Sequence, residues 1–279
     1  MFKNVLTTVL IWLTALIVSG VFVWLLSDIV IHGLPRLSWA FLAEAPKNAG
    51  RSGGIGPIII STLSILLVAM VTATPLSLAT AVLLSEFTEN DSVIGRLVRR
   101  SLDVLAGVPS IVFGLFGNAF FCIYLGLGFS ILSGGLTLAC MVLPILIRTA
   151  EEGLQATPDD YRLAAAALGM SRSATLVHLL LPSAAPALIA GLMLGVGRAV
   201  AETAALIFTS GYVDRMPDSL LDSGRALSVH IYDLSMNVAG GDTNAYSSAL
   251  MLILLLLIIN SIAMSLAKQW LHRDIVLYE

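Results

Sequence analysis

Two charged residues, Arg198 and Glu202, stand inside the hydrophobic stretch 183–209. They are four positions apart, so a helix would place both side chains on one face. Counted from Pro186, Arg198 would lie about 18 Å and Glu202 about 24 Å along such a helix, from the middle of a membrane into its outer half. An arginine at the centre of a membrane helix costs roughly 2.5–3.5 kcal/mol, so it normally faces a cavity or a partner.

The chemistry that this pair could perform is the binding of an oxyanion. The planar guanidinium of Arg198 can make bidentate, charge-assisted hydrogen bonds to phosphate or a similar anion. The carboxylate of Glu202 cannot bind such an anion, but it could hold Arg198 in place or receive it when the anion leaves. The alternative is a self-neutralising pair that only fixes helix packing.

A polar segment, 157–182, interrupts the hydrophobic sequence and predicts two short helices joined at a glycine. Thr157 is a suitable N-cap, Pro158 suits the first helical position, and two aspartates follow in the first turn. Gly169 can take the left-handed conformation that ends the first helix, and Ser171 can cap the second. Such a hairpin between hydrophobic spans is typical of a docking element; the alternative is a well-capped loop.

The composition indicates a helical membrane protein. Of 279 residues, 57% are hydrophobic and only 12% are charged, with a mean hydropathy of +0.93. Soluble domains are about a quarter charged. The net charge of −3 comes without a basic cluster, so no nucleic-acid partner is expected. The histidines are scattered, which gives no support for a metal site, and the absence of any Gly-Lys pair excludes a Walker A loop. We therefore expect no cofactor and no nucleotide site in this chain.

The hydrophobic stretches predict an all-α integral membrane protein with about six transmembrane helices in a single domain, 1–279. Three of these helices contain prolines, at Pro75, Pro109 and Pro144, which are either tolerated kinks or bends that line a gated path. The predicted spans are 5–27, 57–86, 103–125, 130–148, 183–209 and 247–268, with the hairpin at 151–180.

The distribution of lysine and arginine predicts the orientation. One side carries nine such residues: Lys3, Arg96, Arg99, Arg100, Arg148, Arg162, Arg172, Lys268 and Arg273. The other side carries five: Arg36, Lys47, Arg51, Arg215 and Arg225. Because positive residues accumulate in cytoplasmic loops, both termini and the hairpin are expected in the cytoplasm.

The hairpin resembles the EAA loop of ABC-importer permeases. That pattern is E-A-A, three residues, G, nine residues, a hydrophobic residue, any residue, and L-P. One position departs from it, because Leu163 stands where the family has glutamate. The matching residues are Ala164, Ala165, Gly169, Leu179, Leu181 and Pro182.

Further stretches are similar to the phosphate-specific members of this family, and together they cover most of residues 50–210. The stretch that ends in Glu202 and Thr203 resembles a G-R-A-x-x-E-T signature, and the one around Pro109 resembles a signature of the third span. The similar stretches are Gly197-Arg-Ala-Val-Ala-Glu-Thr203, Leu105-Ala-Gly-Val-Pro-Ser-Ile-Val-Phe-Gly-Leu115, Gly53-Gly-Ile-Gly-Pro57, Thr74-Pro-Leu and Ser85-Glu86.

The resemblance implies a type I ABC-importer permease. Two permease subunits would form one path for phosphate, and a soluble phosphate-binding protein would deliver the anion at the outer face. The hairpin, including Leu163, would engage a dimer of ATPase subunits, which bind the ATP. Arg198, Glu202 and Thr203 would line the path. No residue of this chain would be catalytic.

Other interpretations remain open. The chain could be the sister permease subunit, or a permease for another oxyanion such as phosphonate. An ATP-independent anion carrier or channel is a different class, and the docking hairpin argues against it. An intramembrane enzyme would need a serine–histidine, paired-aspartate or His-Glu-x-x-His arrangement, and the predicted spans contain none.

Overall fold

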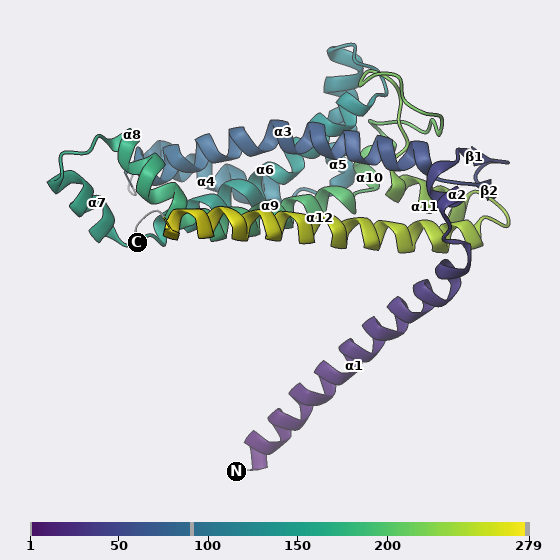
Figure 1. Ribbon diagram of the computed structural model, residues 1–279, viewed down its shortest axis with the longest axis horizontal. Helices are drawn as coiled ribbons and strands as arrows, with labels where there is room; N and C mark the ends of the chain where they lie inside the picture. Colours follow the sequence, from purple (N-terminus) through teal and green to yellow (C-terminus); the bar gives the residue numbers. More distant parts are fainter. Residues whose placement is uncertain (1, 90–91, 277–279) are drawn as a thin grey trace.

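The computed structural model describes residues 2–89 and 92–276, and side chains within 7–89 and 92–265. Long helices run side by side along the molecule: α3 (Gly56–Glu86), α6 (Ile131–Gln155), α9 (Leu181–Val200) and α12 (Asp242–Val276) (Figure 1). Within the described residues, five helices are long and apolar enough to cross a membrane, or six if one bent pair counts as a span.

The core of the bundle lies between α3, α6 and α9. Ile65, Leu138 and Val142 are fully or almost fully buried in it. Small residues allow close contact between helices: a Cβ at Gly195 would lie 3.0 Å from Leu146, and Gly191 faces Thr149. The Gly-x-x-x-Gly pair therefore brings α9 against α6, because a side chain there would separate the helices.

The predicted third span, 103–125, is not one helix. The chain forms α4 (Val93–Ala106), then α5 (Ser110–Gly117) and the π-helical η2 (Asn118–Tyr124), and the two halves meet at 102°. Pro109 explains the break, because it lacks an N–H and disfavours helical conformation at the residue before it. The stretch that resembles a family signature therefore encodes a bend.

The predicted fifth span, 183–209, extends beyond the end of the helix that the structure shows. Helix α9 ends at Val200, and after three residues the chain forms the short α10 (Ala204–Ile207). At its other end, α9 continues from the hairpin, so that the apolar stretch is 172–200. The predicted fourth span, 130–148, is longer than expected, because α6 extends to Gln155. The second span, 57–86, matches α3 almost residue for residue.

One end of the bundle carries the hairpin, built from α7 (Asp159–Ala167), α8 (Arg172–Thr175) and the π-helical η3 (Leu176–Leu180). The opposite end carries η1 (Leu34–Arg36), α2 (Trp39–Ala43), α11 (Leu227–Met236) and two short strands (Figure 1). The strands β1 (Pro46–Lys47) and β2 (Ser52–Gly53) are antiparallel, with Pro46 opposite Gly53.

Helix α1 (Phe2–Gly33), which contains the whole of the predicted span 5–27, leaves the bundle at the β1–β2 end and extends away from it (Figure 1). None of the residues in its most apolar window is buried. Polar contacts hold its last turns: the hydroxyl of Tyr246 donates to Asp28 at 3.0 Å, and Ser247 donates to the carbonyl of Gly33 at 3.0 Å. In a membrane, lipid or another protein must cover the rest of this helix.

Candidate functional site

Arg198 lies near the middle of the bundle's depth. Helices α9 and α6 run antiparallel, with Gly191 beside Thr149 and Gly195 beside Leu146. One further turn along α9 therefore brings Arg198 level with the region of Leu143. That position is halfway along α6 (Ile131–Gln155). The guanidinium is thus placed where a charge is costly in a membrane unless it faces a cavity, a ligand or a partner.

The side chain of Arg198 is exposed, in the last turn of α9. It shares its helix face with Pro186, Ala190 and Leu194, which are exposed as well. Within the part of the chain that the structure describes, no acidic side chain forms an ion pair with it. The negative end of the α9 dipole is the stabilising feature nearby. The open face of α9 therefore presents a guanidinium without a counter-ion among the described residues.

Glu202 does not join Arg198, which corrects the predicted pair on one helix face. Because α9 ends at Val200, Glu202 lies outside the helix, and it is only 6% exposed. Its Oε1 accepts a hydrogen bond from the N–H of Ala205 at 3.2 Å, as a capping residue of α10 does. Its own carbonyl accepts from Ser228 at 2.6 Å. Thr203 is the half-buried N-cap residue of α10, without a side-chain capping bond.

The two helix breaks border the same hydrophobic cluster. Leu105 and Val108, at the break between α4 and α5, pack against the same cluster as Val196 of α9. That cluster also contains Ala199, just before α9 ends. Interrupted helices inside a membrane protein are tolerated where the free backbone groups are buried in protein or line a cavity. In transporters, such interruptions commonly surround the substrate path.

The hairpin has the predicted turn. Gly169 has φ of +72°, and Ser171 accepts a hydrogen bond from the N–H of Ala174 at 3.2 Å. The start of the hairpin differs from the prediction, because Pro158 is the N-cap residue and makes no side-chain capping bond. Thr157 is buried and its hydroxyl donates back to the carbonyl of Gly153 at 3.4 Å.

The residues predicted to contact an ATPase differ in how far their side chains are exposed. Leu163 is 68% exposed, and Ala164 and Gly169 are exposed too. Ala165, in contrast, is 1% exposed, so its side chain packs inside this chain. Leu179, Leu181 and Pro182 are half-buried at the junction with α9. Leu168, 80% exposed beside Gly169, was missed by the sequence pattern.

Sequence reasoning also missed how the hairpin is anchored to the bundle. Arg162 of α7 makes an ion pair with Glu86, the last residue of α3. A second buried pair joins Arg99 of α4 to Glu151 of α6, at 2.6 Å. The hydrogen bonds to Glu86 raise the pKa of Arg162. No spacing rule could find these pairs, because their members are far apart in the sequence.

The comparisons decide the family. Residues 73–275 match the family described as "Binding-protein-dependent transport system inner membrane component". The chain belongs to this family. It is 31% identical to "Probable ABC transporter permease protein YqgI" of Bacillus subtilis (strain 168), over 95% of this chain and 94% of the relative. It is 33% identical to "Phosphate transport system permease protein PstA" of Mycobacterium leprae (strain TN), over 92% of this chain and 86% of the relative.

Solved structures support the same fold. A methionine ABC transporter, MetNI, in an inward-facing conformation has a TM-score of 0.60 at 18% identity, over 76% of this chain and 95% of that one. A bacterial ABC transporter involved in alginate import has a TM-score of 0.58 at 13% identity, over 92% of this chain and 96% of that one. The chain is therefore a multi-pass inner-membrane permease with the type I ABC-importer fold.

Proposed function

We propose that this permease subunit moves inorganic phosphate into the cell, in a path that it forms with a second permease subunit. The observation that carries the proposal is Arg198, which is exposed at mid-depth on the open face of α9 with no ion-pair partner among the described residues. A guanidinium in that state has all its donors available for an oxyanion. The similarity to relatives named PstA favours phosphate among the oxyanions.

The partner subunits follow from what this chain offers. The hairpin exposes Leu163 and Leu168 at the tip of the molecule, where an apolar side chain can enter a groove of another protein. We assign that groove to a dimer of ATPase subunits, which bind and hydrolyse the ATP, so this chain carries no cofactor and no catalytic residue. A phosphate-binding protein would deliver the anion at the end that carries β1 and β2.

The orientation is part of the proposal. The nine-to-five distribution of lysine and arginine supports a hairpin in the cytoplasm. Helix α12 ends at the hairpin end of the bundle, so the C-terminal end would lie on the same side (Figure 1). Cysteines at Ser52 and Ser219 should react with an impermeant maleimide in intact cells, and one at Ser173 only after permeabilisation. The reverse pattern of labelling would contradict this orientation.

The experiment that tests the function is reconstitution. The permease is expressed with its ATPase, the second permease and the binding protein, and ³²P-phosphate uptake into proteoliposomes is measured with ATP on the ATPase side. Uptake that requires both ATP and binding protein, and that excess sulfate or phosphonate does not compete away, supports phosphate import. Uptake of another oxyanion in preference to phosphate would overturn the substrate. Uptake without ATP would favour a carrier or channel instead.

A further inference from the structure

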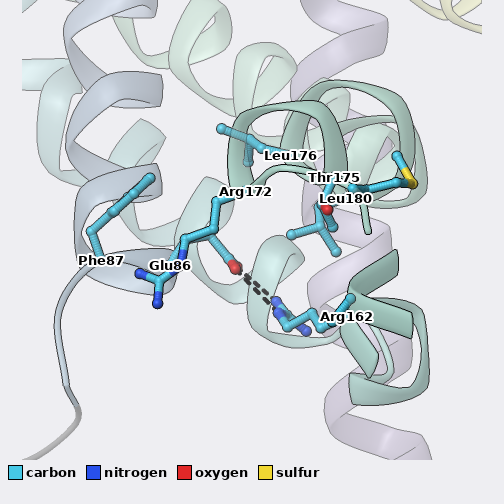
Figure 2. A pocket seen from close by; sticks show the side chains of 9 residues that line it. Glu86, Phe87, Arg162, Arg172, Thr175, Leu176 and Leu180 are labelled. Atoms are coloured by element: carbon cyan, nitrogen blue, oxygen red, sulfur yellow. Dashed lines mark hydrogen bonds and ion pairs between the residues drawn. The ribbon is translucent and has the colours of Figure 1, made fainter. Parts of the chain in front are cut away.

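The hairpin is tied to the bundle by one arginine. Nε of Arg162 donates to Oε2 of Glu86 at 3.1 Å, and Nη2 donates to Oε1 at 2.7 Å (Figure 2). This is the bidentate geometry in which arginine binds a carboxylate most firmly. The two residues are 76 positions apart and come from α7 and α3. The contact therefore joins the hairpin directly to a long helix of the bundle.

The same guanidinium also binds the last turn of α6 and the segment that links α6 to α7. Nη2 donates to the carbonyl of Leu154 at 3.1 Å, and Nη1 donates to the carbonyl of Thr157 at 3.0 Å. Both side chains of the ion pair are largely shielded, with 27% of Arg162 and 14% of Glu86 exposed. Such a pair is screened by solvent much less than a surface ion pair.

The end of α3 is connected to the rest of the bundle as well. Nη2 of Arg99, from α4, donates to the carbonyl of Leu84 at 3.0 Å, and Nε of the same residue pairs with Glu151 of α6. The last turn of α3 is thus joined to α4, α6 and α7. A displacement of the hairpin would be passed to α3, which packs along α6 for most of its length.

Apolar contacts between the hairpin and α3 lie one turn further along the helix, where Val82 packs in the same cluster as Leu176 and Leu180 of η3. Glu86 and Arg162 form part of the wall of a cavity of about 260 Å³, together with Phe87, Leu176 and Leu180 (Figure 2). The cavity separates the end of α3 from α8 and η3. At the cavity wall, the contact that joins α7 itself to α3 is the charged one between Arg162 and Glu86.

From these contacts we infer that Glu86 and Arg162 are positioning residues that couple hairpin movement to α3. The inference rests on the proposed function, because it needs an ATPase that moves the hairpin. The pair would stay closed through the transport cycle and carry the displacement, in addition to the covalent link through residues 156–158. Breaking the pair would leave the hairpin docked but disconnected from the transport path.

The test separates uptake from ATP hydrolysis. Glu86→Gln and Arg162→Gln are assembled with the partner subunits, and three quantities are measured: co-purification of the ATPase, ATP hydrolysis stimulated by loaded binding protein, and uptake. We expect co-purification and hydrolysis to remain near the parent level while uptake per ATP falls by about tenfold. The matched control is Asp159→Asn, which removes the other carboxylate bound to Arg162, one that is 89% exposed. The Asp159→Asn variant should keep the parent's ratio of uptake to ATP hydrolysis.

The double variant Glu86→Gln with Arg162→Gln decides whether the residues act through each other. If they do, the double variant should have the same ratio of uptake to ATP hydrolysis as Arg162→Gln alone, because the first change has already removed the ion pair. Parent-like ratios in the single variants, additive losses in the double variant, or loss of co-purification together with uptake would each overturn the inference. If the parent proves to import a different anion, the proposed substrate fails, but the ratio measured with that anion still tests the pair.

Discussion

Arg198 and Glu202 lie four residues apart, yet one side chain is exposed on the open face of α9 and the other is buried beneath the start of α10. The helix ends between them, at Val200, and the carboxylate of Glu202 accepts a hydrogen bond from the N–H of Ala205. The side chain of Arg198 is therefore not paired with Glu202. Glu202, which the sequence spacing predicts beside Arg198, instead caps the start of α10.

The first prediction concerns His230, which is 1% exposed in α11. Burial and the neighbouring Arg225, whose Nη1 lies 3.4 Å from Nδ1, lower the pKa of His230 from 6.5 to about 4, although Asp233 opposes this shift. The unfolded chain then binds one more proton between these pH values. Stability should fall as the pH decreases from 6.5 towards 4, by on the order of 3 kcal/mol from this residue.

The measurement is the thermal unfolding midpoint of the detergent-solubilised protein at pH 7.5 and pH 4.5. His230→Asn, which keeps an acceptor near the position of Nδ1, should reduce the difference between the two midpoints. His178→Asn, at an exposed histidine, serves as the control and should leave the difference unchanged. If the two unfolding midpoints differ by the same amount in the parent and in His230→Asn, His230 does not contribute to the pH dependence of stability.

The second prediction concerns the turn of the hairpin. Gly169 has φ of +72°, and no atom lies within 4 Å of a Cβ built on it. The penalty for a side chain is thus one of backbone conformation, about 1–2 kcal/mol for an ordinary L-residue. Gly169→Val should make the hairpin more sensitive to limited proteolysis and reduce uptake, while Gly169→Asn should be milder because asparagine tolerates this region. Gly20→Ala, in helical backbone with equally open space, should resemble the parent.

These residues also show what a sequence can predict. Gly169 was predictable because its signal is local: a glycine follows a run of helix formers and precedes a capping serine. The long apolar helices were predictable for the same reason, since the charged residue of α3 is Glu86 at its very end. The break at Pro109 had a local cause too, but the surrounding apolar run favoured one continuous span.

The contacts between distant segments were not predictable. The partner of Glu86 could have been any arginine on the same side, and only the packing of α7 under the end of α3 selects Arg162. Ala165 is equally instructive. Four consecutive alanines look alike in the sequence, and only the fold determines that Ala165 is buried while Ala164 and Ala166 are exposed.

The third prediction follows from that difference. Ala165→Glu would bury a charge for which no partner is provided, which typically costs several kcal/mol, so the hairpin itself should lose protease resistance. Ala164→Glu, next to it and exposed, should leave the hairpin folded but weaken co-purification of the ATPase. Cysteine crosslinking to the ATPase should succeed from Leu163 or Leu168 and fail from Ala165. Efficient crosslinking from Ala165 would contradict the burial that the structure shows.

The fourth prediction concerns Arg198 itself. Arg198→Gln keeps much of the side-chain volume but removes the charge and the guanidinium donors. Because a hydrogen bond to a charged group contributes about 1.5–3 kcal/mol, phosphate uptake should fall by tenfold or more while membrane insertion and subunit assembly stay normal. Arg198→Lys should recover uptake only in part, because an ammonium lacks the planar fork.

The lysine variant separates binding from a structural role. If Arg198 only stabilises the end of α9 through the helix dipole, a lysine would serve nearly as well, since that interaction needs charge and no particular geometry. Glu202→Gln is the matched control, because its amide oxygen can still accept from Ala205 and it should keep most of the uptake. Parent-like phosphate uptake by Arg198→Gln would remove Arg198 from the path. Full recovery by Arg198→Lys would reassign it to helix stabilisation, because only the anion site requires two parallel hydrogen bonds.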